Sequence, residues 1–530
     1  MSAEIVALSL TSLRITPTIV VFGLIVGSTY GILAVGLVLI YRVSKIINFA
    51  HGEIGAFGAA FLSLAVNAWH VPYWVAFPGA LAIAAGMGGL VEVGVIRRLR
   101  NAPRLMSVIA TLGFAQFLAA FSLVVDSQSR TGSLFPEPPG LPAFHVGRLL
   151  VTPALTGMLF LTPLVAVALA LFLRFSRYGI AMRAASANPE SARLDGISAA
   201  RMSTIAWMIA GAVAGITAIL ILPTQTYSGD SFGPSLLVSA LTAAVLARMS
   251  NLVVAYGAGL AVGVLEQVLL FNNPSGGEVQ AILFAIILVA LLFLQPRGGR
   301  GDEKGSAWAT LQGWRPLPEA YRRVFLIRHG SKIVTLTFLA VAAAIPAVAT
   351  SGDTGAVTSI FALGIVGLSI GVITGLAGQL SLGQFAIAAI GATAAIRVAH
   401  DSGNYLLGMI AGGSAGALAS VIVGVPALRI RGLMLAVTTL SLALMSESWL
   451  LQQPWMLGEG TNPGRPVVGP WVLDRAKTYY YLGLVALAAC LWLSHQVRRG
   501  GIGRILVALR DNEDAARAFT IGATGRKLQG

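Results

Sequence analysis

Long uninterrupted runs of apolar residues limit what this 530-residue chain can fold into more than any other feature of its sequence. Several windows exceed the roughly 18 to 20 apolar residues that cross a bilayer. Hydrophobic residues make up 56% of the chain and charged residues 11%, which is more apolar surface than a soluble core can hold. Because a backbone in lipid must satisfy its own hydrogen bonds, spans of this length form helices. The sequence therefore predicts an all-α polytopic membrane protein.

The apolar runs predict about 14–15 hydrophobic segments with short polar loops between them. They lie at residues 18–40, 47–68, 73–96, 105–125, 151–173, 203–222, 235–249, 251–271, 279–294, 333–349, 356–376, 381–398, 405–425, 432–451 and 479–497. The interval 235–271 is ambiguous, because several polar residues interrupt it near its middle. Residues 295–332 are polar and rich in Gly, Pro and Arg, so we expect a linker there between halves at 1–294 and 333–530.

Basic residues gather in alternate loops, and this pattern sets the expected orientation. The loops at 97–104 and 174–201 are rich in arginine, whereas the loop at 126–150 balances its arginines with acids. Since basic loops stay in the cytoplasm, we expect the N-terminus outside the membrane and the linker in the cytoplasm. The net charge of +15 follows from this orientation and gives no reason to expect a nucleic-acid partner.

A polar stretch at 179–197 returns 324 positions later at 503–521. Six of nineteen columns are identical, where average composition gives roughly one or two. The identical pairs are Gly179 with Gly503, Ala184 with Ala508, Asn188 with Asn512, Ala192 with Ala516, Arg193 with Arg517 and Ile197 with Ile521. Each copy follows a long apolar run and, by the loop charges, faces the cytoplasm. The sequence therefore predicts two parallel homologous halves.

Both copies of this repeat have the signals of a short capped helix. Asn188 is a good N-cap, Pro189 suits the first helical position, and Gly196 is placed to end the helix. Asn512 and the two acids after it repeat the start. A helix this short is marginal in water, so something outside the membrane must hold it.

We therefore expect docking helices at about 186–197 and 510–521. A solvated loop helix is the plainer alternative, but its duplication with the caps retained favours docking. Alanine would allow a partner to approach closely, and arginine would make charge contacts. The residues expected at the docking surfaces are Arg183, Ala184, Asn188, Glu190, Ala192, Arg193, Gly196, Asn512, Glu513, Ala516 and Arg517.

A weaker repeat places polar groups within the spans, in INFAHGEIGAFGAAF at 47–61 and QLSLGQFAIAAIGATAA at 379–395. Polar residues inside a membrane are costly, so they are candidates for function. They either cap helices and bond to nearby backbone or line a translocation path, and the sequence leaves both alternatives open. The candidates are Asn48, His51, Glu53, Gln379, Ser381 and Gln384.

The sequence gives no support for a nucleotide site, a disulfide, a metal site or a proton relay. No G-x-x-x-x-G-K-[ST] motif occurs, so the chain does not bind ATP through a P-loop, and GAGLAVG at 257–263 is better explained as a helix-packing surface. The single Cys490 excludes an internal disulfide and a cysteine-based metal cluster. The lone acids Glu92, Glu266 and Glu447 fit local pairs or interfacial positions better than a proton relay. We expect no catalytic residues, no metal and no cofactor.

Two sets of motifs resemble the permease subunits of the branched-chain amino-acid family of ABC importers. YGILAVGLVLIYRVSKIINFAHGEIGAFGA at 30–59 and RYGIAMRAASANPESARLDGI at 177–197 resemble the first subunit. GLAGQLSLGQFAIAAIGA at 375–392, LRIRGLMLAVTTLSLA at 428–443 and GRILVALRDNEDAARA at 503–518 resemble the second. The chain looks like a fusion of both.

This resemblance implies a permease for branched-chain amino acids or similar small polar solutes, since importers of urea and short amides share the motifs. It also implies two cytoplasmic ATPase subunits, into which the repeated helices dock, and an extracytoplasmic solute-binding protein. The family's second subunit continues past the docking loop, whereas this sequence ends at Gly530. We therefore expect an incomplete second half, with a separate chain as a possible source of the missing spans. The alternative function is a secondary transporter or channel driven by an ion gradient, which would take up solute without ATP.

Overall fold

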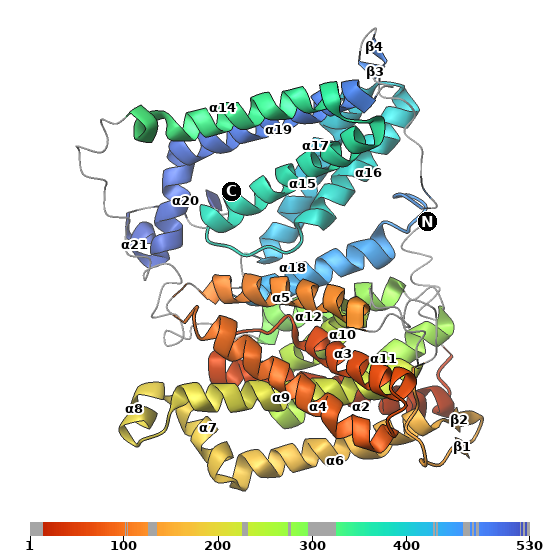
Figure 1. Cartoon of the computed structure of the whole chain (residues 1–530). Helices are drawn as coiled ribbons and strands as arrows, with labels where there is room; N and C mark the ends of the chain where they lie inside the picture. The colour runs from red at the N-terminus through yellow and green to blue at the C-terminus, as the bar shows by residue number, and fades with distance from the viewer. Residues whose placement is uncertain are drawn as a thin grey trace. The chain divides into compact units, whose positions relative to one another are not determined.

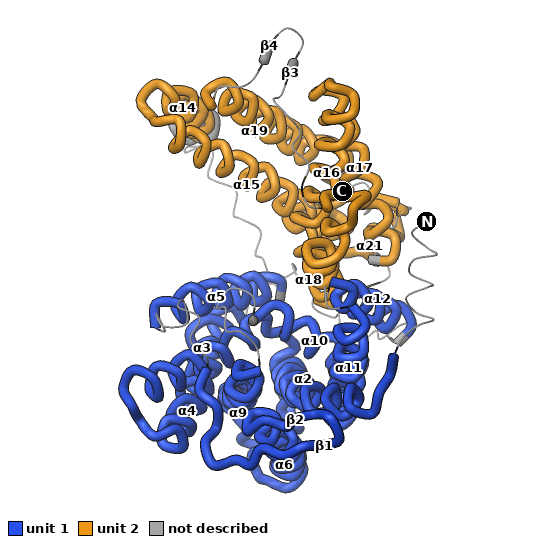
Figure 2. The backbone as a smooth tube through the Cα atoms, turned by 90° about the vertical axis from the view of Figure 1, so that its right-hand side faces the viewer, with its two compact units in different colours: residues 1–298 blue, residues 299–530 orange. Residues whose placement is uncertain are grey.

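The computed structural model divides into two compact units, Met1–Gly298 and Gly299–Gly530 (Figure 2). The residues described are 14–100, 102, 104–125, 135–224, 232–273, 277–294, 325–427, 430, 433–458, 460, 467–468, 471–472, 476–519, 521–522 and 525–526.

Unit 1 is a helical bundle with one short hairpin (Figure 1). Its elements are α2 (Pro17–Ser44), α3 (His51–Ser63), η1 (Leu64–Ala68), α4 (Tyr73–Val91), η2 (Glu92–Ile96), α5 (Arg104–Val125), β1 (Phe144–Val146), β2 (Leu149–Val151), α6 (Pro153–Phe175), α7 (Arg177–Ala187), α8 (Pro189–Leu194), α9 (Ala199–Ile221), η4 (Leu222–Thr224), α10 (Phe232–Leu246), α11 (Leu252–Asn272) and α12 (Gly277–Leu294). The segments η1 and η2 are π-helical turns that continue α3 and α4. The strands β1 and β2 pair antiparallel, with Phe144 opposite Val151.

Helix α2 is the centre of unit 1. Every residue from 25 to 40 is buried, because α6, α9, α10 and α11 pack around the helix. Thr16 caps its start by accepting a hydrogen bond from the amide of Ile19, and Pro17 takes the first helical position. Lys45 adopts a left-handed φ of 55° and ends the helix, so the chain turns back into the bundle before α3.

Unit 2 repeats the same order of elements after one additional helix. It contains α14 (Phe325–Val348), α15 (Ser351–Gly375), α16 (Gln384–Ser402), α17 (Tyr405–Ala427), α18 (Met434–Met445), η5 (Ser446–Leu450), β3 (Val467–Val468), β4 (Trp471–Val472), α19 (Ala476–Arg499), α20 (Gly501–Asp511) and α21 (Glu513–Ala518). From α15 onward these elements correspond in order to α2–α8, and β3 pairs with β4 antiparallel as β1 pairs with β2. A short hairpin precedes α6 in unit 1 and α19 in unit 2.

Glycines set the closest helix crossings. A Cβ built on Gly259 of α11 would lie 2.2 Å from the Cα of Gly31 of α2, and one on Gly55 of α3 would lie 2.3 Å from the carbonyl oxygen of Ala214 of α9. No real side chain tolerates such distances, so these backbones can approach only where glycine stands. Gly259 belongs to the GAGLAVG segment, and its interpretation as a packing surface is confirmed.

The expected fold class, an all-α polytopic membrane protein, is confirmed. Within the described ranges, nine helices are long and apolar enough to cross a membrane, and four shorter apolar helices accompany them. The ambiguous interval 235–271 forms two helices, because Arg248 and Met249 take left-handed φ angles of 53° and 52° between them. Two expected boundaries were wrong. The span expected from residue 47 becomes helical only at His51, and α14 already starts at Phe325 within the expected linker, most of which lies outside the described residues.

Candidate functional site

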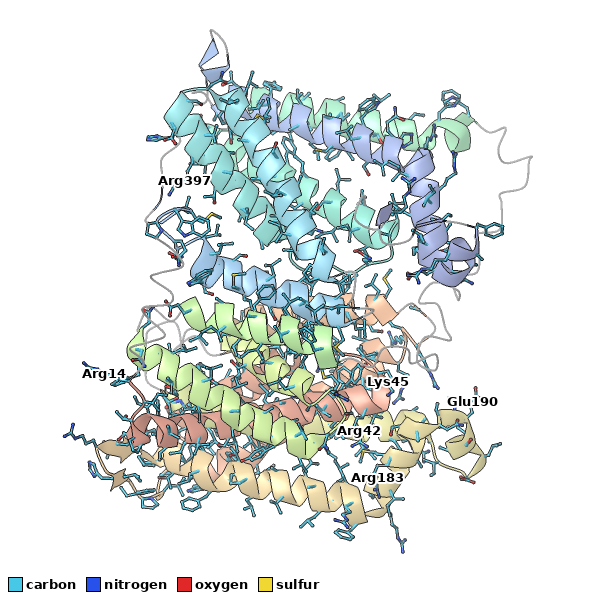
Figure 3. All side chains as sticks on the ribbon, turned by 180° about the vertical axis from the view of Figure 1, so that it is seen from behind. Arg14, Arg42, Lys45, Arg183, Glu190 and Arg397 are labelled. Atoms are coloured by element: carbon cyan, nitrogen blue, oxygen red, sulfur yellow. The ribbon has the colours of Figure 1, made fainter. Side chains whose placement is uncertain are left out.

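The first copy of the repeat forms an elbow at one end of unit 1, where α7 bends away from α6 and α8 follows (Figure 1). Ser176 separates α6 from α7, and its hydroxyl accepts a hydrogen bond of 2.9 Å from the amide of Gly179. A Cβ on Gly179 would lie 2.4 Å from the carbonyl oxygen of Phe172, so the bend requires glycine. Figure 3 shows Arg183 on α7 and Glu190 on α8, at the outer edge of the unit.

The second copy forms the same elbow in unit 2. Gly500 separates α19 from α20, and a Cβ on Gly503 would lie 2.2 Å from the carbonyl oxygen of Val497. The identity between Gly179 and Gly503 is therefore explained by the bend that each residue permits. In both elbows the third helix begins directly after a single extended residue, Asn188 or Asn512.

The predicted caps are present in both copies. The Oδ1 atom of Asn188 accepts bonds of 3.0 and 3.1 Å from the amides of Glu190 and Ser191, and that of Asn512 accepts one of 3.0 Å from Ala515. Gly196 has a φ of +78°, as expected for the residue that ends the helix. The helices themselves, α8 and α21, are shorter than the ranges 186–197 and 510–521 expected from the sequence.

Ala192 and Ala516 are turned toward their own chain. Their exposed fractions are 3% and 5%, so they do not offer the open surface for a partner's close approach that the sequence led us to expect. Ala516 packs with Leu509 of α20 and with Ile521, which holds α21 against α20. Ala184 has a backbone role as well, since its carbonyl accepts a bond of 3.1 Å from the amide of Asn188. Most identities in the repeat thus maintain the elbow.

The exposed side chains differ between the two copies. Arg517 forms an ion pair of 2.6 Å with Glu513 one turn earlier, whereas Arg193 has no ion-pair partner in the part of the chain that the structure describes. Leu194 is 89% exposed beside Arg193, and Phe519 is 80% exposed beside Arg517. Around its third helix each elbow therefore presents an exposed arginine beside a large exposed apolar side chain, in different surroundings.

The first set of polar candidates lies at the buried start of α3. Asn48 and His51 are fully buried, and Glu53 is 8% exposed. Asn48 Oδ1 accepts a bond of 3.0 Å from the amide of Ala50, which is the capping alternative, but its Nδ2 has no partner among the described residues. The ring of His51 lies against Gly36 of α2, and neither ring nitrogen is within hydrogen-bond geometry, although the Leu33 carbonyl is nearby.

Glu53 brings α3 together with α10. Its carboxylate lies against the Cα of Gly233, where any larger residue would collide with it, and it has no hydrogen-bond partner among the described residues. Gly233 is in the first turn of α10, and Glu53 is in the first turn of α3. The acid therefore lies where the first turns of two helices meet.

The second set lies in unit 2, on the turn that leads into α16. Gln384 is the first residue of that helix and is 9% exposed, and its Nε2 has no partner among the described residues. Gln379 bonds through its backbone: its carbonyl oxygen accepts a bond of 3.2 Å from Thr374, and its amide donates one of 3.2 Å to the Ile373 carbonyl. Ser381 is half-buried. Gln384 thus corresponds to His51, because each residue begins the second helix of its repeat.

Two corresponding threonines, one in each unit, bind the polar turns, and the sequence did not predict this role. The amide of Phe49 donates a bond of 3.4 Å to Thr111 Oγ1 of α5, and the amide of Leu382 donates one of 2.9 Å to Thr439 Oγ1 of α18. Each donor lies two residues before the start of α3 or α16. A Thr-Leu pair in the third helix after each polar turn was the available signal. The same bond therefore fixes the polar turn in both units.

Of the lone acids, two have local partners, as expected. Glu92 pairs with Arg97 at 2.8 Å, and Glu266 accepts hydrogen bonds of 3.0 Å from Tyr30 and 3.4 Å from Ser239. Glu447 is exposed.

Comparison with known proteins decides the family. The protein family described as "Branched-chain amino acid transport system / permease component" matches residues 19–292 and again 354–529. The chain belongs to this permease family. Because the family supplies the membrane component of ABC importers, this chain is a transmembrane permease and not an enzyme, and ATP hydrolysis belongs to separate subunits.

Individual relatives agree with this membership. The permease is 27% identical over 294 residues to the high-affinity branched-chain amino acid transport permease LivH of Escherichia coli K12, covering 52% of this chain and 92% of LivH. It is 29% identical over 288 residues to BraD of Pseudomonas aeruginosa, with the same two coverages. It is 26% identical over 225 residues to LivM of Salmonella typhimurium, covering 37% of this chain and 53% of LivM. No solved structure gives a significant match.

Proposed function

We propose that this permease carries branched-chain amino acids, or similar small polar solutes such as urea and short amides, into a bacterial cell across its plasma (inner) membrane. The relatives named for branched-chain amino acid transport support this solute class. The loop charges support an orientation with the N-terminus outside and with the linker, α8 and α21 in the cytoplasm. An extracytoplasmic binding protein would deliver the solute.

The elbows α6–α7–α8 and α19–α20–α21 are the docking elements for two cytoplasmic ATPase subunits. The observation that carries this proposal is the duplicated construction of the elbows. Glycine, asparagine and alanine are retained at the bend, the cap and the inner face, while Arg193 and Arg517 remain exposed. A stable elbow with an outward arginine and an apolar neighbour fits a protein partner that contributes acids and an apolar pocket.

Charge reversal tests the docking. Arg193→Glu together with Arg517→Glu should abolish co-purification of the ATPase subunits and reduce ATP-driven uptake, with membrane insertion unchanged. The matched control is Arg98→Glu with Arg100→Glu, which makes the same charge change at two exposed arginines outside both elbows. Equal co-purification of the ATPase with both double variants would refute the docking assignment.

The polar turns before α3 and α16 line the path of the solute. This proposal rests on Asn48 Nδ2, His51 and Gln384 Nε2, which are buried polar groups without partners in the described ranges. Each buried polar group without a hydrogen-bond partner lowers the stability of this conformation by about 1–3 kcal/mol. A second conformation in which water reaches these groups would recover that free energy. The path therefore closes over these residues in the conformation described here.

Thiol labelling tests the path. In a Cys490→Ala background, cysteine at 48, 51 or 384 should resist a small aqueous thiol reagent in this conformation. It should become reactive when a nucleotide is trapped in the ATPase. Cysteine at Ala80, which is fully buried where α4 meets α3, should stay protected in both states. Protection of all four positions in every state would contradict the path assignment.

Competition identifies the solute. Uptake of labelled leucine into proteoliposomes that contain the permease, the ATPase and the binding protein should require ATP. An excess of valine or isoleucine should reduce it, and an excess of urea or acetamide should not. Competition by the amides alone would reassign the solute class.

A further inference from the structure

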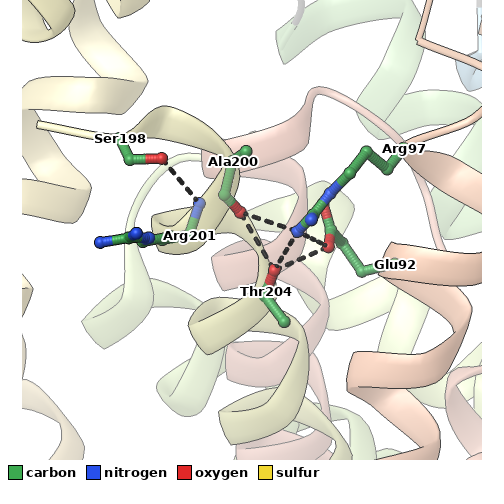
Figure 4. A network of polar contacts seen from close by, with 6 residues as sticks. All are labelled: Glu92, Arg97, Ser198, Ala200, Arg201 and Thr204. Atoms are coloured by element: carbon green, nitrogen blue, oxygen red, sulfur yellow. Dashed lines mark hydrogen bonds and ion pairs between the residues drawn. The ribbon is translucent and has the colours of Figure 1, made fainter.

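A cluster of three polar side chains joins the end of α4 to the start of α9. Arg97 Nη2 donates bonds of 2.8 Å to Glu92 Oε2 and 2.6 Å to Thr204 Oγ1, and Thr204 Oγ1 donates one of 2.7 Å to Glu92 Oε2 (Figure 4). Arg97 Nη2 also lies 3.4 Å from the carbonyl oxygen of Ala200. The Glu92 side chain is 4% exposed, and these donors compensate for its burial.

The π-helical turn η2 makes this cluster possible. In an α-helix, residues five positions apart lie about 140° apart around the axis, so Glu92 and Arg97 would face different sides. A π-helical turn closes hydrogen bonds from i to i+5, and here the Arg97 amide donates one of 2.7 Å to the Glu92 carbonyl. The turn therefore stacks the arginine over the acid and directs both toward α9.

The cluster lies immediately downstream of the elbow. Only residues 195–198 separate α8 from α9, and the Ile197 amide ties this link to the Ala192 carbonyl at 2.9 Å. Ser198 caps α9 through the amide of Arg201. A force on α8 thus reaches the first two turns of α9, where Ala200 and Thr204 contact Arg97.

Beyond the cluster, α4 and α9 are in close contact. A Cβ on Gly88 would lie 2.3 Å from the Trp207 carbonyl oxygen, and one on Gly211 would lie 2.4 Å from that of Ala84. Both helices also pack on α3, through Gly58 against Ala84 and Gly55 against Ala214. The helix that carries His51 and Glu53 is therefore supported by the two helices that the cluster joins.

We infer that Glu92, Arg97 and Thr204 form a coupling clamp that makes α4 and α9 move together when a partner displaces α8. This inference rests on the proposed docking of α8 to an ATPase. The three are positioning residues: without them α9 could shift at its cytoplasmic end while α4 and α3 stay behind. ATP would then be hydrolysed without proportionate transport.

The test measures solute molecules imported per ATP hydrolysed, in proteoliposomes that contain the permease, its ATPase partners and the binding protein. Glu92→Ala, Arg97→Ala and Thr204→Val should each lower this ratio about tenfold, within the roughly 5- to 150-fold range of coupling between sites. ATPase co-purification should remain unchanged. Glu92→Gln keeps an acceptor oxygen for both donors and should restore much of the ratio. Arg98→Ala and Ser203→Ala, adjacent residues outside the cluster, should match the wild type.

The outcomes separate this inference from the function on which it rests. If the wild-type permease shows no ATP-driven uptake, the proposed function fails. If the wild type couples normally and Glu92→Ala and Thr204→Val keep its ratio, the clamp is refuted. Should Glu92→Ala not assemble, Arg97→Ala and Thr204→Val still decide. A parallel fall in ATPase activity and uptake, at an unchanged ratio, would also refute the clamp, because it would show a general structural defect.

Discussion

Two glycines in the same helix allow the α4–α9 crossing to be tested with a single methyl group. Gly88 of α4 faces α9, and a Cβ built on it would lie 2.3 Å from the Trp207 carbonyl oxygen. Gly86, two residues earlier, is exposed, and a Cβ there would meet nothing within 4 Å. We therefore compare Gly88→Ala with Gly86→Ala.

The structure sets the size of the effect. Carbon contacts are favourable at about 3.5–4.0 Å, so the two backbones must separate by about 1 Å to admit the methyl group of Gly88→Ala. Overpacking of this kind costs about 1–3 kcal/mol. Both substitutions gain the same helix propensity, about 1 kcal/mol, which cancels in the comparison. Gly88→Ala should therefore be less stable than Gly86→Ala by about 1–3 kcal/mol.

The measurement is equilibrium unfolding from mild-detergent micelles by titration with sodium dodecyl sulfate, followed by circular dichroism. Gly211→Ala provides a second check, since its Cβ would lie 2.4 Å from the Ala84 carbonyl oxygen on the same crossing. Once the helices have separated for one methyl group, the second costs less, so the double variant should lose less than the sum of the single losses. Equal stability of Gly88→Ala and Gly86→Ala would refute the close crossing.

Two further predictions concern the polar turn and the elbow. Thr439→Val removes the acceptor of the Leu382 amide and should lower the free energy of unfolding by about 1–3 kcal/mol, whereas Thr438→Val loses only a bond to the Met434 carbonyl of its own helix and should cost less in the same titration. Asn188→Ala removes the cap of α8 and should cost about 1 kcal/mol, seen as faster hydrogen exchange at the Ala192 and Ile197 amides. Asn188→Ser should keep the protection, and unchanged exchange in Asn188→Ala would contradict the role of the cap.

The sequence by itself determined the fold class and the position of the repeat. Runs of about 20 apolar residues predict membrane-spanning helices, because a segment of this length satisfies its own backbone hydrogen bonds in lipid as a helix. The caps of α8 and α21 were also predictable, since a cap depends on residues within one turn of the chain: asparagine at 188 and 512, and glycine at 196. The approximate places of the polar turns followed from the cost of polar groups within apolar segments.

Only the tertiary structure decided which neighbour each residue meets. Ala192 and Arg193 are adjacent in the sequence, yet one is buried against its own chain and the other is exposed, because the fold of the elbow selects the inner face of a six-residue helix. In the sequence Glu92 is a lone acid. In the structure a π-helical turn brings Arg97 to it, and a helix more than one hundred residues away contributes Thr204. The pattern of apolar residues does not specify which span lies at the centre of a helix bundle, because an apolar span can face lipid as well as other helices. The burial of α2 was therefore settled by glycines that let α11 approach it closely.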